Sequence, residues 1–129
     1  TVGLTPDGGA TAFLSEFVSR QVLTELCLTG ERVSGERMHQ LGCINRLTEP
    51  GGALAAAMAL AGQLSTGPAH AMARIKTLCH SAQHQSLQQQ LEQEAEYMVE
   101  AQGSEESREG IGAFLDKRAP DYVRLRSQP

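Results

Sequence analysis

Aromatic residues are scarce in this sequence. It contains no tryptophan, two tyrosines and three phenylalanines in 129 residues, so any core must be built from aliphatic side chains. With 40% hydrophobic and 20% charged residues, the composition is that of an ordinary globular protein and excludes a disordered or fibrous chain. A chain of this length has the size of one domain and can bury a core without disulfides or metals.

Cysteines are also few. Cys27, Cys43 and Cys79 are odd in number, widely separated and form no Cys-x-x-Cys pair, which argues against a disulfide framework or a zinc site. His80 and His84 lie four residues apart, but the glutamate that completes a His-Glu-x-x-His motif is missing, so we expect no metal. The sequence contains no Gly-x-Ser-x-Gly elbow, so nothing in it indicates nucleophilic catalysis of the hydrolase type.

Long apolar runs and an excess of positive charge are absent as well. No stretch approaches the roughly 20 apolar residues that span a bilayer, and no signal-peptide pattern is present. The net charge of -4 gives no general attraction to nucleic acid or anionic lipid. We therefore expect neither as a partner, and a cytoplasmic location. A mitochondrial or other organellar location stays open, because the sequence does not begin with methionine.

Most of the sequence shows the apolar periodicity of amphipathic helices. Apolar residues recur every three or four positions, and glycine, proline and serine mark the ends of the runs. The last run should present Ile111, Phe114 and Leu115 as its apolar side. The predicted helical segments extend from the Gly8-Gly9 turn to Thr29, from Ser34 to Gly42, from Gly52 to about Ser65, from Pro68 to Ala82, from Ser86 to Gln102, and from Ser104 to Pro120.

One segment breaks this pattern. Residues 43–48 alternate apolar and polar side chains, which predicts a short strand in a mainly α fold. Such a strand is too short to form a sheet alone and needs a partner. Together with the abrupt start at Thr1, this leads us to expect that the chain is the C-terminal portion of something longer.

Asp7 has two interpretations. Between Pro6 and Gly8 it fits an ordinary turn, and aspartate before a helix is an ordinary N-cap. A carboxylate at a glycine-rich bend can also approach a ligand closely and move a proton. Both interpretations remain open from the residues alone.

The segment FLDKRAP, residues 114–120, also has two interpretations. Lys117 and Arg118 at the end of a helix complement its dipole. Alternatively, the lysine serves as a point charge for a phosphate while the Phe114 ring offers a flat face to a nucleotide.

Three stretches resemble a known family. GLTPDGGATAFL at 3–14, LTGERVSGERMHQLGCINRL at 28–47 and SEESREGIGAFLDKRAP at 104–120 look like the C-terminal half of the enoyl-CoA hydratase/isomerase (crotonase) superfamily. The resemblance implies a core of repeated ββα units followed by a helical region that helps to form trimers or hexamers. Residues 1–48 would then be the end of the core, with the Asp-Gly-Gly turn and last strand. Residues 49–129 would be the helical region for oligomerisation and coenzyme A contact.

The resemblance also implies a chemistry. Members of the family bind acyl-CoA thioesters as substrates, hold no permanent cofactor, and stabilise an enolate-like oxyanion with two backbone N–H groups, which lie in the N-terminal half of the family pattern. Asp7 falls where certain isomerases place an acid/base and a dehalogenase-like branch places a nucleophile. Phe114 and Lys117 match positions that approach the CoA adenine or phosphates, often across a subunit boundary.

Two functions follow as expectations. In the first, the chain is the C-terminal part of an enzyme acting on enoyl-CoA thioesters and is inactive by itself, because the oxyanion donors lie elsewhere. In the second, it is a non-catalytic oligomerisation or interaction module derived from the family. The residues upstream of Thr1 in the parent gene would discriminate between the two.

Overall fold

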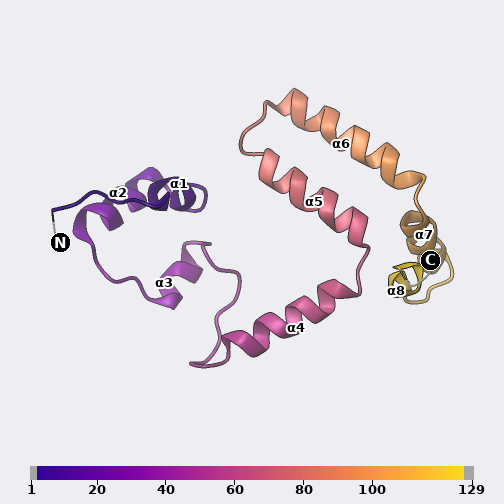
Figure 1. The fold of residues 1–129 in the computed structure, drawn as a ribbon, viewed down its shortest axis with the longest axis horizontal. Coiled ribbons are helices and arrows are strands. Elements are labelled where there is room, and N and C mark those ends of the chain that lie inside the picture. The colour runs from indigo at the N-terminus through magenta and orange to yellow at the C-terminus, as the bar shows by residue number, and fades with distance from the viewer. Residues whose placement is uncertain (1–2, 127–129) are drawn as a thin grey trace. The chain divides into compact units, whose positions relative to one another are not determined.

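The computed structural model describes residues 3–126. Helices joined by short loops make up most of this range (Figure 1), which confirms the prediction of a mainly α chain. The helices are α1 (Ala10–Ser15), α2 (Arg20–Thr29), α3 (Gly35–Gln40), α4 (Ala53–Ser65), α5 (Ala69–Ser81), α6 (Leu87–Gln102), α7 (Glu105–Leu115) and α8 (Tyr122–Arg126).

The short strand predicted at 43–48 was wrong for the described part of the chain. No residue of 3–126 is in a strand, and 43–48 is irregular loop. The Cys43 N–H donates to the Met38 carbonyl at 2.9 Å, so the start of the segment completes the end of α3. Alternation of apolar and polar residues forms a strand only when a neighbour supplies hydrogen bonds, and the described residues contain no such neighbour.

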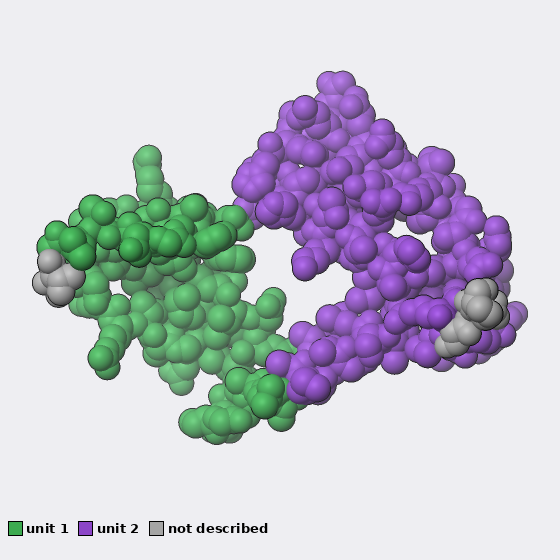
Figure 2. Space-filling view, viewed as in Figure 1, with its two compact units in different colours: residues 1–56 green, residues 57–129 purple. Residues whose placement is uncertain are grey.

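The chain divides into two compact units, Thr1–Ala56 and Ala57–Pro129 (Figure 2). In the first unit, α1 and α2 pack together. Serine residues begin two of its helices: the Ser19 hydroxyl accepts from the Val22 N–H at 3.4 Å, and the Ser34 hydroxyl accepts from the Arg37 N–H at 3.1 Å. These bonds satisfy N–H groups that have no partner within the helix.

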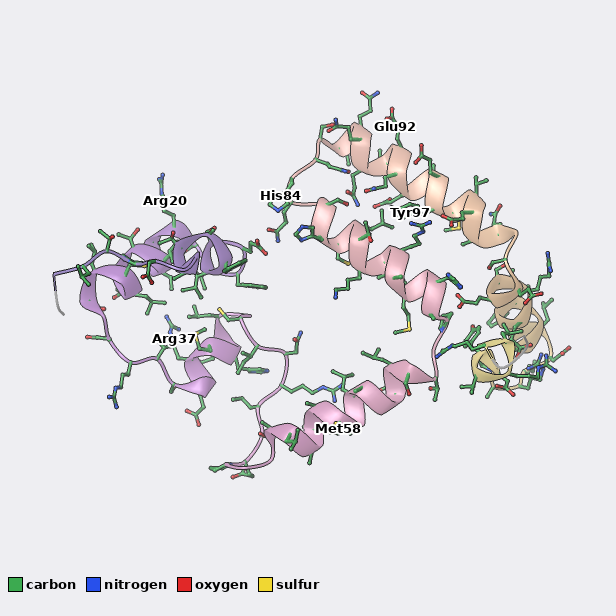
Figure 3. The ribbon with its side chains drawn as sticks, viewed as in Figure 1. Arg20, Arg37, Met58, His84, Glu92 and Tyr97 are labelled. Carbon is green, nitrogen blue, oxygen red and sulfur yellow. The ribbon has the colours of Figure 1, made fainter. Side chains whose placement is uncertain are left out.

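In the second unit, α5 and α6 lie side by side (Figure 1). Arg74 on α5 reaches Glu100 on α6, with Nη2 and Oε1 2.7 Å apart. Its guanidinium also lies 4.5 Å from the centre of the Tyr97 ring, the residue labelled on α6 in Figure 3. The hydrogen bond to Glu100 raises the pKa of Arg74. This exposed group ties the two helices together on one side.

Side chains of α7 and α8 contact each other and other parts of this unit. The Glu106 carboxylate accepts from the backbone N–H groups of His70 and Ala71 at 3.0 and 3.1 Å, so a side chain of α7 caps the start of α5. Tyr122 of α8 packs so closely on Gly110 of α7 that a Cβ there would lie 2.7 Å from the tyrosine oxygen. A side chain at position 110 would therefore displace the end of the Tyr122 side chain.

Little of the described chain is buried. Within residues 3–126, only Ala113 and Glu109 are buried, with 1% and 8% of their surface exposed. The expected apolar side of α7 at Ile111, Phe114 and Leu115 is instead exposed, so α7 turns its Glu109–Ala113 stripe inward. No described helix combines the length and the apolar character needed to cross a membrane.

Candidate functional site

Asp7 lies on an exposed turn before α1, next to two glycines. Its carbonyl accepts from the Ala10 N–H at 3.1 Å, and the next two residues, Gly8 and Gly9, have φ values of 61° and 82°. Both values are in the left-handed region, which glycine adopts at little cost. A Cβ at Gly8 would meet nothing within 4 Å, whereas a Cβ at Gly9 would lie 2.8 Å from the Phe13 ring.

The Asp7 side chain does not cap α1. The N-cap is Gly9, and no side chain hydrogen-bonds to the start of the helix. Asp7 is exposed, and within residues 3–126 its carboxylate has no hydrogen bond or ion pair. The turn interpretation of the sequence therefore holds for the Asp7 backbone and not for its carboxylate. An unengaged carboxylate is available to accept a proton from a ligand.

The C-terminal end of α7 forms a second, more constrained turn. The Lys117 N–H donates to the Phe114 carbonyl at 3.2 Å, and the Arg118 N–H donates to the Ala113 carbonyl at 3.0 Å. This pair of bonds is a Schellman motif, in which the residue after the cap adopts the left-handed conformation. That residue is Lys117, with φ of 55°. Glycine is usual at this place, and a lysine there costs about 1 kcal/mol.

The turn presents two exposed side chains of unlike chemistry. Phe114 exposes 81% of its surface, and Lys117, three residues later, is also exposed. The Lys117 ammonium forms no ion pair with the part of the chain that the structure describes. An aromatic face and an unpaired cation are suitable for a base and a phosphate, respectively.

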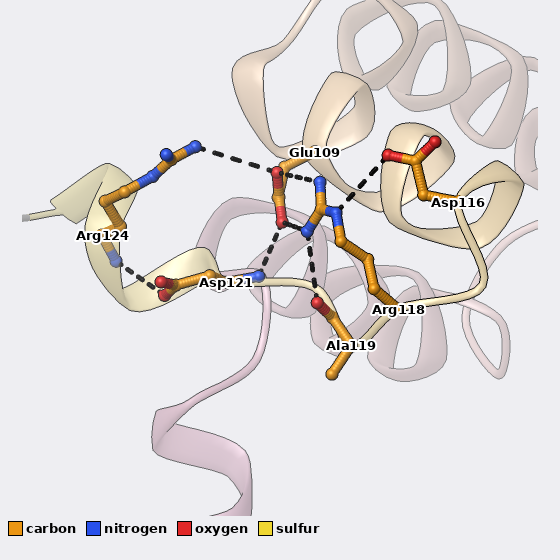
Figure 4. A network of polar contacts seen from close by, with 6 residues as sticks. All are labelled: Glu109, Asp116, Arg118, Ala119, Asp121 and Arg124. Carbon is orange, nitrogen blue, oxygen red and sulfur yellow. Dashed lines mark hydrogen bonds and ion pairs between the residues drawn. The ribbon is translucent and has the colours of Figure 1, made fainter.

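Glu109 anchors the turn from inside (Figure 4). Arg118 donates to it through both terminal nitrogens, Nη1 to Oε1 at 2.6 Å and Nη2 to Oε2 at 3.1 Å. The Asp121 N–H donates to Oε1 at 2.7 Å, and Arg124 Nη2 lies 4.0 Å from Oε2. The carboxylate thus holds the chain on both sides of Pro120.

These contacts set the protonation of the network. The Arg118 hydrogen bonds, followed by the Asp121 N–H, lower the pKa of Glu109 to about 2 from its ordinary value of 4.5. In return, the hydrogen bond to Glu109 raises the pKa of Arg118. Arg118 is therefore engaged within the protein, and of the two neighbouring cations only Lys117 remains available to a ligand.

Among residues 3–126, the histidines singled out in the sequence do not belong to a metal site. The rings of His80 and His84 lie edge to face with centres 5.5 Å apart, but within 3–126 no three His, Cys, Asp or Glu side chains form a metal-binding group. A cleft of about 800 Å³ lies among α5, α6, α7 and α8. Its Glu100 and Glu106 carboxylates are already engaged with Arg74 and the α5 backbone, so they serve helix packing.

The sequence of the chain matches the pattern of a known family. The profile described as enoyl-CoA hydratase/isomerase aligns with residues 1–124. The chain belongs to the enoyl-CoA hydratase/isomerase family. The enoyl-CoA hydratase/isomerase resemblance seen in the three sequence stretches is thereby confirmed.

Individual enoyl-CoA hydratase/isomerase relatives agree with this assignment. The 1,2-epoxyphenylacetyl-CoA isomerase of Escherichia coli K12 is 35% identical over 95% of this chain and 47% of its own length. The 2,3-dehydroadipyl-CoA hydratase of the same organism is 29% identical over 95% of this chain and 48% of its own. A solved enoyl-CoA hydratase from Polaromonas sp. JS666 is 41% identical, with a TM-score of 0.87 over 93% of this chain and 47% of that one. The chain spans about half the length of the curated relatives it matches.

The structure of this family member places the predicted site residues in two groups. Phe114 and Lys117 come together on one turn of the second unit, whereas Asp7 lies in the first unit. Their roles stay predictions. Sequence reasoning missed Glu109, which pairs with Arg118 nine positions away. The available signal was a charged residue four positions before Ala113, on the same helix stripe.

Proposed function

We propose that this chain is the C-terminal part of an acyl-CoA enzyme that stabilises an enolate of an enoyl-CoA thioester and moves a proton. The observation that carries the proposal is the Asp7 carboxylate, exposed and without a partner in residues 3–126, on a turn where a Cβ at Gly8 would meet nothing within 4 Å. Family membership over residues 1–124 supplies the substrate class.

Asp7 acts in this proposal as the acid/base that transfers a proton between two carbons of the acyl chain. Oxyanion stabilisation must come from backbone N–H groups that the family resemblance assigns to the N-terminal half. Residues 1–129 alone are then inactive. By the family resemblance, an aspartate at this position favours double-bond isomerisation over hydration.

Phe114 and Lys117 hold the coenzyme A moiety in this proposal. The phenylalanine ring stacks on the adenine while the lysine ammonium faces a phosphate. The net charge of -4 repels an anionic substrate in general, so a local, unpaired cation is needed to bind it. No permanently bound cofactor is required by this chemistry.

The test is substitution of Asp7 by asparagine in the full-length protein. Asp7→Asn keeps the shape of the side chain and removes its ability to take up a proton, so isomerase kcat should fall roughly a hundredfold or more. Isomerase and hydratase rates are measured separately on a short enoyl-CoA. Glu16→Gln, an exposed carboxylate at the end of α1, is the matched control and should leave both rates unchanged.

Unchanged isomerase activity in Asp7→Asn would refute the catalytic role of Asp7 and leave only its role in the turn. A fall in hydratase activity alone would move the proposed reaction from isomerisation to hydration. Purified residues 1–129 should give no turnover above the buffer rate, and measurable turnover would refute the need for the N-terminal oxyanion donors.

A second candidate function is that of an oligomerisation module without catalysis, with trimers or hexamers as the assemblies expected from the family. The favouring observation is the exposure of large apolar side chains on the helices, such as Leu54 at 73%, Met58 at 65% and Met98 at 61%. Absence of isomerase and hydratase turnover in the full-length protein, with its assembly intact, would favour this function over the enzyme.

A further inference from the structure

Glu109 has an unusual position for a carboxylate in this protein. Most acidic side chains of the described chain are exposed, whereas Glu109 exposes 8% of its surface. Buried charges persist when their oxygens are satisfied, and here two Arg118 nitrogens and the Asp121 N–H satisfy them at 2.6, 3.1 and 2.7 Å. Figure 4 shows these bonds converging on the Glu109 side chain from the segment that follows α7.

The two anchor points bracket one short stretch of backbone. Arg118 directly follows Lys117, the one residue other than glycine that has a positive φ among those described. Asp121 begins the approach to α8, where its own carboxylate accepts from the Arg124 N–H at 3.1 Å. A strained backbone conformation persists only where the surroundings impose it. The Glu109 contacts and the two Schellman bonds are what impose it here.

We infer that Glu109 is a positioning residue: through Arg118 and the Asp121 N–H, it holds the turn after α7 in the conformation that presents Lys117 to a phosphate of a coenzyme A thioester. This inference rests on the proposed function, which supplies the ligand. Glu109 itself does not touch the ligand. It keeps the ammonium in place before the ligand binds. The turn is then already ordered, and binding does not have to overcome the entropy cost of ordering it.

The experiment is a double-mutant cycle of Glu109→Gln and Lys117→Ala in the full-length protein, read as the Kd for coenzyme A by titration calorimetry. Lys117→Ala should weaken binding about tenfold through loss of one charged phosphate contact. Glu109→Gln should weaken it about fivefold in the parent protein and not at all in the Lys117→Ala background. Such non-additivity is expected of residues that act through one contact.

Matched controls come from the same unit. Glu100→Gln breaks the exposed Arg74–Glu100 pair and should leave the Kd unchanged, as should Lys76→Ala, the removal of the other lysine in the chain. Arg118→Lys keeps the charge but loses the two-pronged hydrogen bond. It should weaken coenzyme A binding less than Glu109→Gln does. If Glu109→Gln does not fold, Arg118→Lys takes its place in the experiment.

A second readout follows the turn directly. Amide hydrogen exchange at Lys117 and Arg118 should accelerate at least about tenfold in Glu109→Gln. Unchanged exchange, or equal weakening of coenzyme A binding in both backgrounds, would overturn the inference. A Kd that responds to Lys117→Ala but not to Glu109→Gln would overturn it while leaving the proposed coenzyme A contact intact. A Kd that does not respond to Lys117→Ala would instead refute that contact.

Discussion

Glu109 makes the fold sensitive to acid. Its pKa is about 2 in the folded chain and 4.5 ordinarily, so below about pH 4.5 the unfolded chain takes up a proton that the folded chain does not. The stabilisation from this carboxylate is therefore complete above pH 4.5 and is lost as the pH falls toward 2. We expect the free energy of unfolding, measured with urea between pH 6 and pH 3, to fall more steeply for the native protein than for Glu109→Gln.

Glu105 provides the comparison, because it lies on the same helix, in its exposed first turn. Glu105→Gln should keep the pH dependence of the native protein. Identical slopes for the native protein and Glu109→Gln would contradict the role assigned to the buried network. The surrounding charges are Arg118, Arg124 and Asp116, and both arginines stay protonated throughout this range.

The sequence predicts only part of the candidate site. Asp7, Phe114 and Lys117 are sequence predictions, made because glycine, aromatic and basic residues in a known order carry local signals, and their roles stay predictions. The pairing of Glu109 with Arg118 depends on a turn that reverses the chain after α7, and no spacing rule describes it. The left-handed conformation of Lys117 was equally hidden, since sequence favours glycine there.

At the scale of one helix, the start of α6 is a capping box. The Ser86 hydroxyl accepts from the Gln89 N–H at 3.3 Å, while the Gln89 side chain accepts from the Ser86 N–H at 3.0 Å. Ser86→Ala should lower the free energy of unfolding by about 1 kcal/mol, measured by urea denaturation with circular dichroism. Ser65→Ala, at the end of α4, removes a hydroxyl that bonds only to the Gly62 carbonyl and should change it by less than about 0.5 kcal/mol. Equal effects would show that the box contributes nothing.

Helix ends were predictable where their signals are local. Ser34, Ser86 and Ser104 begin helices as the sequence indicates, because each hydroxyl meets an N–H three residues ahead. The strand at 43–48 was wrong because alternation does not supply a neighbour. The short α8 after Pro120 was missed although its start signal is local, because the Asp121 carboxylate accepts from the Arg124 N–H three residues ahead.

At the scale of the whole molecule, exposed apolar surface governs association. Leu87, Leu91 and Ala95 line one open side of α6, and Leu91 exposes 54% of its surface. We expect the protein to self-associate with rising concentration, and Leu91→Glu to shift it toward smaller species, because a charge cannot be buried there without a partner. Size-exclusion chromatography with light scattering measures the masses.

Gln85→Glu adds the same charge outside the helix and should leave the association unchanged. A native protein that stays monomeric at every concentration would contradict the prediction. A Leu91→Glu variant with the native masses would instead place the contact on another helix.

The cap that Glu106 provides for α5 has a consequence for synthesis. The carboxylate lies 36 residues downstream of His70, whose N–H it accepts. On the ribosome, the first turn of α5 therefore emerges without its partner and stays frayed until α7 has left the exit tunnel. The order of translation thus makes the completion of α5 a late event, which depends on the arrival of a helix made after it.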